Sequence, residues 1–245
     1  MMVVRMLLGI RRFRLESGPK GTGSSMTTRS TPHSTEQKTR QFSFLGGDPS
    51  IDFVNTVDEM LGDSPIDQLE SYGDLLDWSE QASLICTDII ASLQEAAQEC
   101  ERDSERVLRQ ARLFRSHLRD VLTSFVEDRP PEARDLKAIT AYARKAAAHS
   151  RLDCCGDGFA WVLDEASGCE LDWPIWELAR AAVALLTSDS LNRLRRCANE
   201  TCGWLFIDQS RNHSRRWCDM SSCGNRAKAR RNYARQTAKR KTKQG

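Results

Sequence analysis

Residues 197–226 read CANETCGWLFIDQSRNHSRRWCDMSSCGNR and hold four cysteines in two pairs. Four residues separate Cys197 from Cys202, four separate Cys218 from Cys223, and fifteen lie between the pairs. Structural zinc sites hold four ligands in a tetrahedron, and thiolates are among the favoured ligands. The spacing therefore predicts one structural Zn²⁺ bound by these four cysteines.

Two cysteines only a few residues apart can reach one ion if the backbone turns tightly between them. Gly203 and Gly224 follow the second cysteine of each pair and suit such turns. We expect a hairpin between the two pairs, with strands at 204–207 and 214–217 and a turn at 208–212. This hairpin would bring the pairs face to face.

Other uses of the cysteines stay open. A disulfide framework would require an oxidising compartment, the thiols could pack as apolar side chains, and a zinc site could release its metal on oxidation. His213 lies between the pairs and is interpreted as a surface or phosphate-contacting residue, because four thiolates already complete the zinc shell. The cysteines that share no ligand spacing are Cys86, Cys100, Cys154, Cys155 and Cys169.

The net charge of +2 hides a division between two parts of the chain. From residue 191 onward there are 15 Lys and Arg against 3 Asp and Glu, whereas the preceding residues hold 21 basic and 31 acidic side chains. We expect an acidic body at 41–190 and a basic module at 191–236. Such an asymmetry is typical of a module that binds a polyanion.

The segment 224–243, GNRAKARRNYARQTAKRKTK, is rich in Ala, Arg and Lys and predicts a helix. Its basic side chains, together with arginines of the expected hairpin, are candidates for DNA contact. The other interpretation is a frayed tail that binds any nucleic acid, and we expect 237–245 to be such a disordered tail. The candidate DNA contacts are Arg211, Arg215, Arg216, Asn225, Arg226, Lys228, Arg230, Arg231 and Arg235.

The body shows three strong helical patterns. Apolar residues recur at three- and four-residue steps over 104–127, which predicts a helix capped by Ser104. A second helix is expected to open at Pro131 and to run to about 149, and a strongly apolar third helix spans about 174–187.

Smaller elements complete the expected body. Residues 151–163 predict a hairpin around a Gly-Asp-Gly turn, and residues 64–85 predict one or two short helices. The segment 51–57 fits either a strand or the start of a helix. The predicted fold class is mainly α with a small β component (α+β): a helical body followed by a small zinc-bound module of hairpin and helix.

The composition predicts no membrane partner, because no stretch approaches the roughly 18 apolar residues that a spanning helix needs. Residues 1–40 are rich in Ser, Thr, Lys and Arg and are expected to be a disordered extension without an export signal. The expected compartment is a reducing cytoplasm, where paired cysteines more often hold metal than form disulfides.

Asp52 and Asn55 are candidate polar groups of a pocket in the body. The other interpretation is that they hydrogen-bond to the backbone at a turn or helix cap. Asp52 could also be paired with His117 or His149 as a catalytic dyad, but the chain lacks the nucleophile elbow, the phosphate-binding loop and the zinc-protease motif. We therefore expect no enzyme.

The tetrapeptide at Cys223–Arg226 spells CGNR, and with Trp217-Cys218 and the first cysteine pair it resembles a CGNR-type zinc finger. The preceding body resembles the ABATE domain of bacterial stress-induced transcription regulators, through Gly46-Gly47, DFVNT at 52–56 and LLDW at 75–78. The resemblance implies four cysteine zinc ligands and a DNA-binding finger.

Together these features predict a zinc-dependent DNA-binding transcription regulator, whose body senses a small-molecule or protein effector or forms a homodimer. One alternative is an RNA-binding protein, which would require exposed Trp204 or Trp217 for base stacking. We expect instead that Trp204, Phe206 and Trp217 form the small core of the module. Another alternative is a zinc module for protein–protein interaction.

Overall fold

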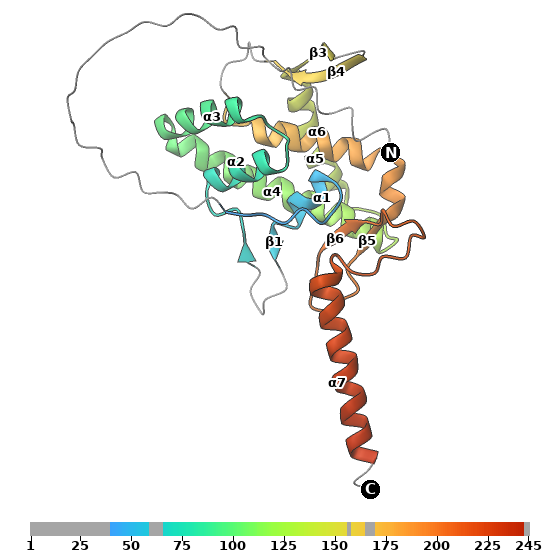
Figure 1. Cartoon of the computed structure of the whole chain (residues 1–245). Helices are drawn as coiled ribbons and strands as arrows, with labels where there is room; N and C mark the ends of the chain where they lie inside the picture. The colour runs from blue at the N-terminus through green and yellow to red at the C-terminus, as the bar shows by residue number, and fades with distance from the viewer. Residues whose placement is uncertain (1–39, 59–65, 156–157, 165–169, 243–245) are drawn as a thin grey trace, which may run out of the picture.

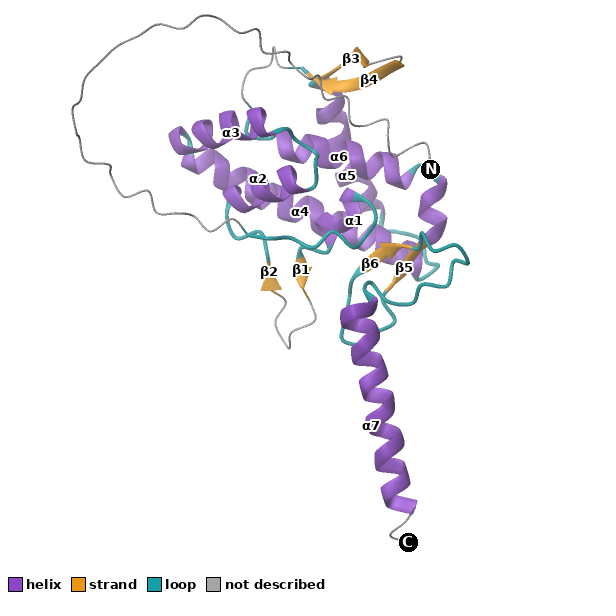
Figure 2. Ribbon diagram, viewed as in Figure 1, coloured by secondary structure: helices purple, strands orange, loops and turns teal. Residues whose placement is uncertain are grey.

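The computed structural model describes residues 40–58, 66–155, 158–164 and 170–242. The disorder expected at residues 1–39 and at 243–245 lies outside these ranges, as does Cys169. Within them the chain forms a mostly helical body, small antiparallel hairpins and one long C-terminal helix that projects away from the body (Figures 1 and 2). This agrees with the predicted α+β class.

The helices of the body come first along the chain. They are α1 (Pro49–Val54), α2 (Tyr72–Gln81), α3 (Thr87–Glu99), α4 (Glu101–Val126), α5 (Ala133–Ala148) and α6 (Trp173–Leu186). The strands pair in sequential hairpins, β1 (Val57–Asp58) with β2 (Ile66–Asp67), β3 (Ser150–Cys155) with β4 (Gly158–Leu163), and β5 (Leu194–Arg196) with β6 (Leu205–Ile207). The remaining elements are η3 (Asp189–Arg193), η4 (Met220–Gly224) and α7 (Asn225–Thr242).

Helix α4 confirms the strongest periodic pattern of the sequence. Its buried side chains include Val107, Ala111, Phe114 and Leu118, which lie three or four residues apart and therefore on one face. The predicted cap at Ser104 is wrong: the helix begins earlier, and the Ser104 hydroxyl donates to the carbonyl of Glu101 inside its first turn.

Helix α6 is confirmed as the most apolar predicted helix, and α5 is confirmed but begins at Ala133 rather than Pro131. On α5, Ile139 and Ala146 face the core, whereas Leu136 is 43% exposed. The predicted hairpin at 151–163 is formed by β3 and β4, with Leu152 opposite Trp161.

The segment whose type the sequence left open is helical. Asp48 caps α1 by accepting a hydrogen bond from the Ser50 amide at 2.8 Å, and Pro49 occupies the first helical position. The short helix ends at Val54 with Asn55 as its C-cap, and β1 begins two residues further on. α1 lies between the body helices and the C-terminal hairpin (Figure 1).

The hydrophobic core continues from the body into this hairpin. Leu194 of β5 and Leu205 and Ile207 of β6 are 2% exposed and pack in the same buried cluster as the helices. Backbone and side-chain hydrogen bonds accompany the apolar contact: the Ile207 amide donates to the Gly46 carbonyl at 2.7 Å. The β5–β6 hairpin is therefore anchored to the body.

The Asn55 side chain makes two hydrogen bonds that join the hairpin to the body. Its Nδ2 donates to the Leu205 carbonyl at 2.9 Å, and its Oδ1 accepts from the Leu205 amide at 3.0 Å. Asn55 thus pairs with both backbone groups of one residue of β6, as a neighbouring strand would. We call this pair of hydrogen bonds the Asn55 clasp.

Replacing Asn55 with Ala leaves the buried amide and carbonyl of Leu205 without partners. We expect the free energy of unfolding of the full chain to fall by roughly 2–4 kcal/mol. Urea unfolding followed by circular dichroism measures this, with Asn192→Ala at an exposed position as the matched control. Equal stability of the two variants would show that the clasp contributes nothing.

Candidate zinc centre and basic helix

Four buried thiols meet in the C-terminal module. The Sγ atoms of Cys197, Cys202, Cys218 and Cys223 all lie within 4.8 Å of one another. Cys218 is 3.7 Å from Cys202 and 3.6 Å from Cys223, measured between sulfurs. Zinc–sulfur bonds of about 2.3 Å in a tetrahedron give sulfur–sulfur edges of about 3.8 Å. The four cysteines therefore fit one Zn²⁺ ion, as the sequence predicted.

The electrostatics of the four thiols favour a cation. Hydrogen bonds from Cys202 and Cys218 lower the pKa of Cys197 to about 2. Donating to Cys197 raises the pKa of the Cys202 thiol to about 12. Without a cation the group thus carries its charge mainly at Cys197, since like charges so close together repel. A divalent cation replaces the protons and holds all four sulfurs as thiolates.

The first cysteine pair lies in the loop of the β5–β6 hairpin. The Cys197 amide donates to the Trp204 carbonyl at 2.9 Å, and the Cys202 amide donates to the Asn199 carbonyl at 2.8 Å. These bonds fold the connection back on itself, so that both sulfurs face the same point.

The hairpin predicted between the two cysteine pairs is wrong. β6 pairs with β5, which precedes the first cysteine, and residues 214–217 form no strand. The reason is the buried Asp208, whose carboxylate accepts from the Ser210 amide at 2.9 Å and the Arg215 amide at 3.0 Å. This compact loop brings the second cysteine pair to the first without a strand.

The short helix η4 positions the second cysteine pair. The Asp219 carboxylate accepts from the Ser222 amide at 2.7 Å and caps this helix. A Cβ at Gly224 would lie 2.5 Å from the sulfur of Met220, so the exposed Met220 side chain packs directly over this glycine. The Asn225 side chain donates to the Ser221 carbonyl at 2.9 Å and joins η4 to α7.

Arg215, a predicted DNA contact, is instead engaged within the protein. Its guanidinium donates to the carbonyls of Trp217 and Leu45, each at 3.0 Å, and to that of Cys218. It also lies 4.4 Å from the centroid of the Phe206 ring. The side chain therefore ties the zinc module to the body, a role that its position among other arginines did not reveal.

The other basic residues extend over the free surface of the module. α7 holds eight Lys and Arg residues and no Asp or Glu, and it projects away from the body (Figure 1). It continues to Thr242, so residues 237–242 of the expected disordered tail are helical. The predicted contacts with exposed side chains are Arg211, Arg216, Asn225, Arg226, Lys228, Arg230, Arg231 and Arg235.

The aromatic residues of the module are mainly internal. Trp204 is 6% exposed and Phe206 is fully buried, and both pack with the four cysteines. Trp217 is partly buried against the same cluster, with the Arg216 guanidinium 5.5 Å from its ring centroid. They form the small core that we expected.

Asp52 and Asn55 both form hydrogen bonds with the backbone of other segments. Asp52 accepts from the Gly46 amide at 2.6 Å, and Asn55 forms the clasp with Leu205. These hydrogen bonds support the backbone-bonding interpretation, and the pocket assignment stays a prediction. A Cβ at Gly46 would lie 2.8 Å from the Asp52 carboxylate, which explains why glycine stands there.

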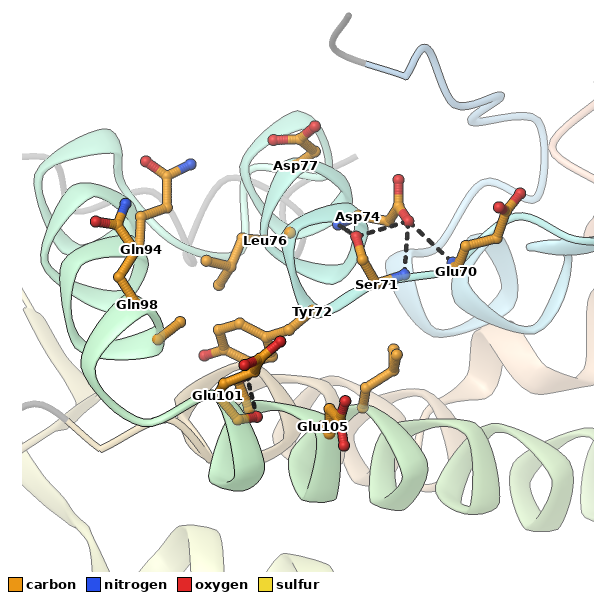
Figure 3. A pocket seen from close by; sticks show the side chains of 14 residues that line it. Glu70, Ser71, Tyr72, Asp74, Leu76, Asp77, Gln94, Gln98, Glu101 and Glu105 are labelled. Atoms are coloured by element: carbon orange, nitrogen blue, oxygen red, sulfur yellow. Dashed lines mark hydrogen bonds between the residues drawn. The ribbon is translucent and has the colours of Figure 1, made fainter. Parts of the chain in front are cut away.

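A cavity of about 810 Å³ does lie in the body, between α2, α3 and α4. Figure 3 shows Tyr72 and Leu76 of α2, Gln98 of α3, and Glu101 and Glu105 of α4 around it. Its walls combine apolar surface with carboxylates. The sequence offered no signal for it, because its lining comes from short, separate segments.

A helical body joined to a four-cysteine zinc centre and a basic helix defines a zinc-finger protein. Residues 47–189 match the ABATE family, described as "Putative stress-induced transcription regulator", and residues 193–236 match the CGNR zinc finger. The first match covers more than half of the chain. The chain therefore belongs to the ABATE family, which carries this description, and it holds a CGNR zinc finger. Neither description names an enzyme.

A search of curated proteins found no match to this chain. Among the residues that the structure describes, no helix has the length and apolar character required to cross a membrane.

Replacing Cys202 with Ser removes one zinc ligand. We expect the zinc content of the purified chain to fall from about one ion per chain towards zero and the module to unfold, since structural zinc contributes folding free energy directly. Zinc is measured by atomic emission. Cys154→Ser, at an exposed cysteine outside the cluster, is the control and should keep its zinc. Full zinc content in the Cys202 variant would refute the ligand set.

Burial raises the pKa of Asp52 to about 7, so the folded chain binds a proton that the unfolded chain has released. The contribution of Asp52 to stability is present below about pH 4 and is lost as the pH rises to about 7. Asp52→Asn keeps an oxygen acceptor for Gly46 without the charge.

We therefore expect Asp52→Asn to stabilise the chain at pH 8 by roughly 1–3 kcal/mol more than at pH 5. Urea unfolding at the two pH values measures the difference. Asp189→Asn, at a group outside this buried network, controls for general charge effects. The same effect of Asp52→Asn at both pH values would contradict the raised pKa.

Proposed function

We propose that the protein is a zinc-dependent DNA-binding transcription regulator of the cytoplasm, in which the zinc centre fixes the base of α7 and α7 contacts DNA. The observation that carries this proposal is the charge of α7, eight basic residues and no acidic one on a helix that leaves the body. Neighbouring cations on a solvated helix repel one another, and phosphate groups remove that repulsion.

The size of the helix supports the same proposal. The major groove of DNA is about 12 Å wide and admits one α-helix. In other zinc-supported modules a helix attached to the metal site enters this groove. α7 begins directly after the last zinc ligand, Cys223, so its first turns have a fixed attachment.

The candidate DNA contacts fall into two groups, side chains exposed to solvent and side chains that are hydrogen-bonded within the protein. Arg226, Lys228, Arg231 and Arg235 are exposed on α7, and Arg211 and Arg216 add charge from the preceding loop. These six are the proposed DNA contacts. Three predicted contacts are left out because hydrogen bonds within the protein already engage their side chains: Arg215 with backbone carbonyls, Asn225 with the Ser221 carbonyl and Arg230 with the Asn199 side chain.

The body is proposed to sense an effector or to mediate dimerisation, and the protein is proposed to have no catalytic activity. The cavity between α2, α3 and α4 has the volume of a small-molecule site, which makes it the candidate position for an effector. The RNA-binding alternative has less support, since base stacking needs exposed rings, whereas Trp204 is 6% exposed and Trp217 is partly buried against the cysteines. No observation favours a protein-interaction module over DNA binding.

The test is selection of the zinc-loaded full chain against a library of random duplex DNA at near-physiological salt, with a chelator-treated sample beside it. We expect one short sequence to be enriched and the enrichment to disappear with the metal. Binding without enrichment that falls steeply with salt would leave a non-specific polyanion interaction and contradict the regulator assignment.

Arg231→Ala with Arg235→Ala removes two charges from α7. We expect at least a roughly tenfold loss of DNA affinity and a salt dependence whose slope falls by about two, one for each phosphate contact. Fluorescence anisotropy over a salt series measures both quantities. Lys137→Ala with Lys145→Ala removes the same charge from exposed positions of α5 and serves as the control. Equal losses in both double variants would point to net charge alone.

A further inference from the structure

Asn199 is a buried polar residue in the loop between the first two cysteines. It is 1% exposed, and its side chain contacts both sides of the zinc module. Its Nδ2 lies 3.4 Å from the Sγ of Cys223 and donates to it. Its Oδ1 accepts from the guanidinium of Arg230 on α7 and from the Thr201 hydroxyl at 3.4 Å.

The orientation of this amide is fixed by its partners. Turning the amide over would direct its oxygen at the Cys223 thiolate and its NH₂ group at the Arg230 guanidinium. Both contacts would then be repulsive, because a thiolate accepts and a guanidinium only donates. The two partners therefore select the same rotamer of Asn199.

The Asn199 amide also joins parts of the module that are distant in sequence. Cys223 lies at the end of η4, where α7 begins, and Arg230 lies on the second turn of α7. The loop that holds Asn199 follows β5, which is anchored to the body. One contact holds the start of the helix and the other holds a point further along it, so together they restrain the direction of α7.

We infer that Asn199 is a positioning residue that links the zinc thiolate of Cys223 to Arg230 and thereby sets the direction in which α7 leaves the zinc centre. Donors to metal-bound ligands stabilise the ligand charge, and their loss weakens metal binding by roughly 10–100-fold. The same amide holds α7 through Arg230. Its importance for DNA binding rests on the proposed function, but its effect on zinc and on the helix does not.

Two substitutions separate the two contacts in the full chain. Asn199→Asp keeps the oxygen acceptor for Arg230 and loses the N–H donor to Cys223, whereas Arg230→Ala removes only the helix side. Asn199→Ala removes both. Arg231→Ala, on the neighbouring exposed position of α7, is the matched control, and far-UV circular dichroism checks that each variant is folded.

The first readout is metal binding. We expect Asn199→Ala and Asn199→Asp to lose zinc to a chelator at least tenfold faster than the unaltered chain, and to shift the thiolate-to-metal absorption of the Co²⁺-loaded protein. Arg230→Ala and Arg231→Ala should leave both close to the unaltered values. Unchanged zinc release and Co²⁺ absorption in both Asn199 variants would overturn the link to Cys223.

The second readout is hydrogen exchange of the backbone amides at 226–231. We expect at least tenfold faster exchange there in Asn199→Ala and in Arg230→Ala, with no further increase in the double variant and none in Arg231→Ala. Independent, multiplying effects of Asn199→Ala and Arg230→Ala would overturn the link to α7. DNA is absent from both readouts, so failure of the chain to bind DNA would contradict the proposed function and leave this inference standing.

Discussion

Two hydrogen bonds between the side chain of Asn55 and the backbone of Leu205 join the body to the C-terminal hairpin, across 150 positions of sequence. They place β6 against α1, and β6 in turn pairs with β5. The loop of that hairpin holds the first two zinc ligands, and the zinc centre holds the base of α7. The position of the basic helix therefore depends on an asparagine in the first helical segment of the body.

The clasp also gives a physical meaning to the DFVNT segment at 52–56. Asp52 accepts from the amide of Gly46, Asn55 binds β6, and the Thr56 hydroxyl accepts from the buried Arg115 at 2.7 Å. Each polar side chain in this segment forms a hydrogen bond with a polar group that folding removes from water. Polar residues in an apolar run can suggest a binding pocket, but here they form the frame on which the zinc module is built.

The features that could be predicted from the sequence are those that depend on residues close together along the chain. The cysteine spacing defined the zinc ligands, and the three-to-four-residue periodicity defined α4 and α6. The partner of β6 could not be read in the same way, because strands of three residues carry little pattern and the apolar face of β6 packs against the distant body. The role of Arg215 was equally hidden, since an arginine that binds carbonyls and one that binds phosphate look alike in sequence.

The anchored hairpin has a thermodynamic consequence for metal binding. Cys197 and Cys202 lie in the loop of a hairpin that the body core already orders, so half of the ligand set is preorganised before the ion arrives. Part of the zinc affinity is thus a property of the body. Since linkage is reciprocal, any molecule that stabilises the docked hairpin must tighten zinc binding, and zinc must tighten the binding of that molecule by the same factor.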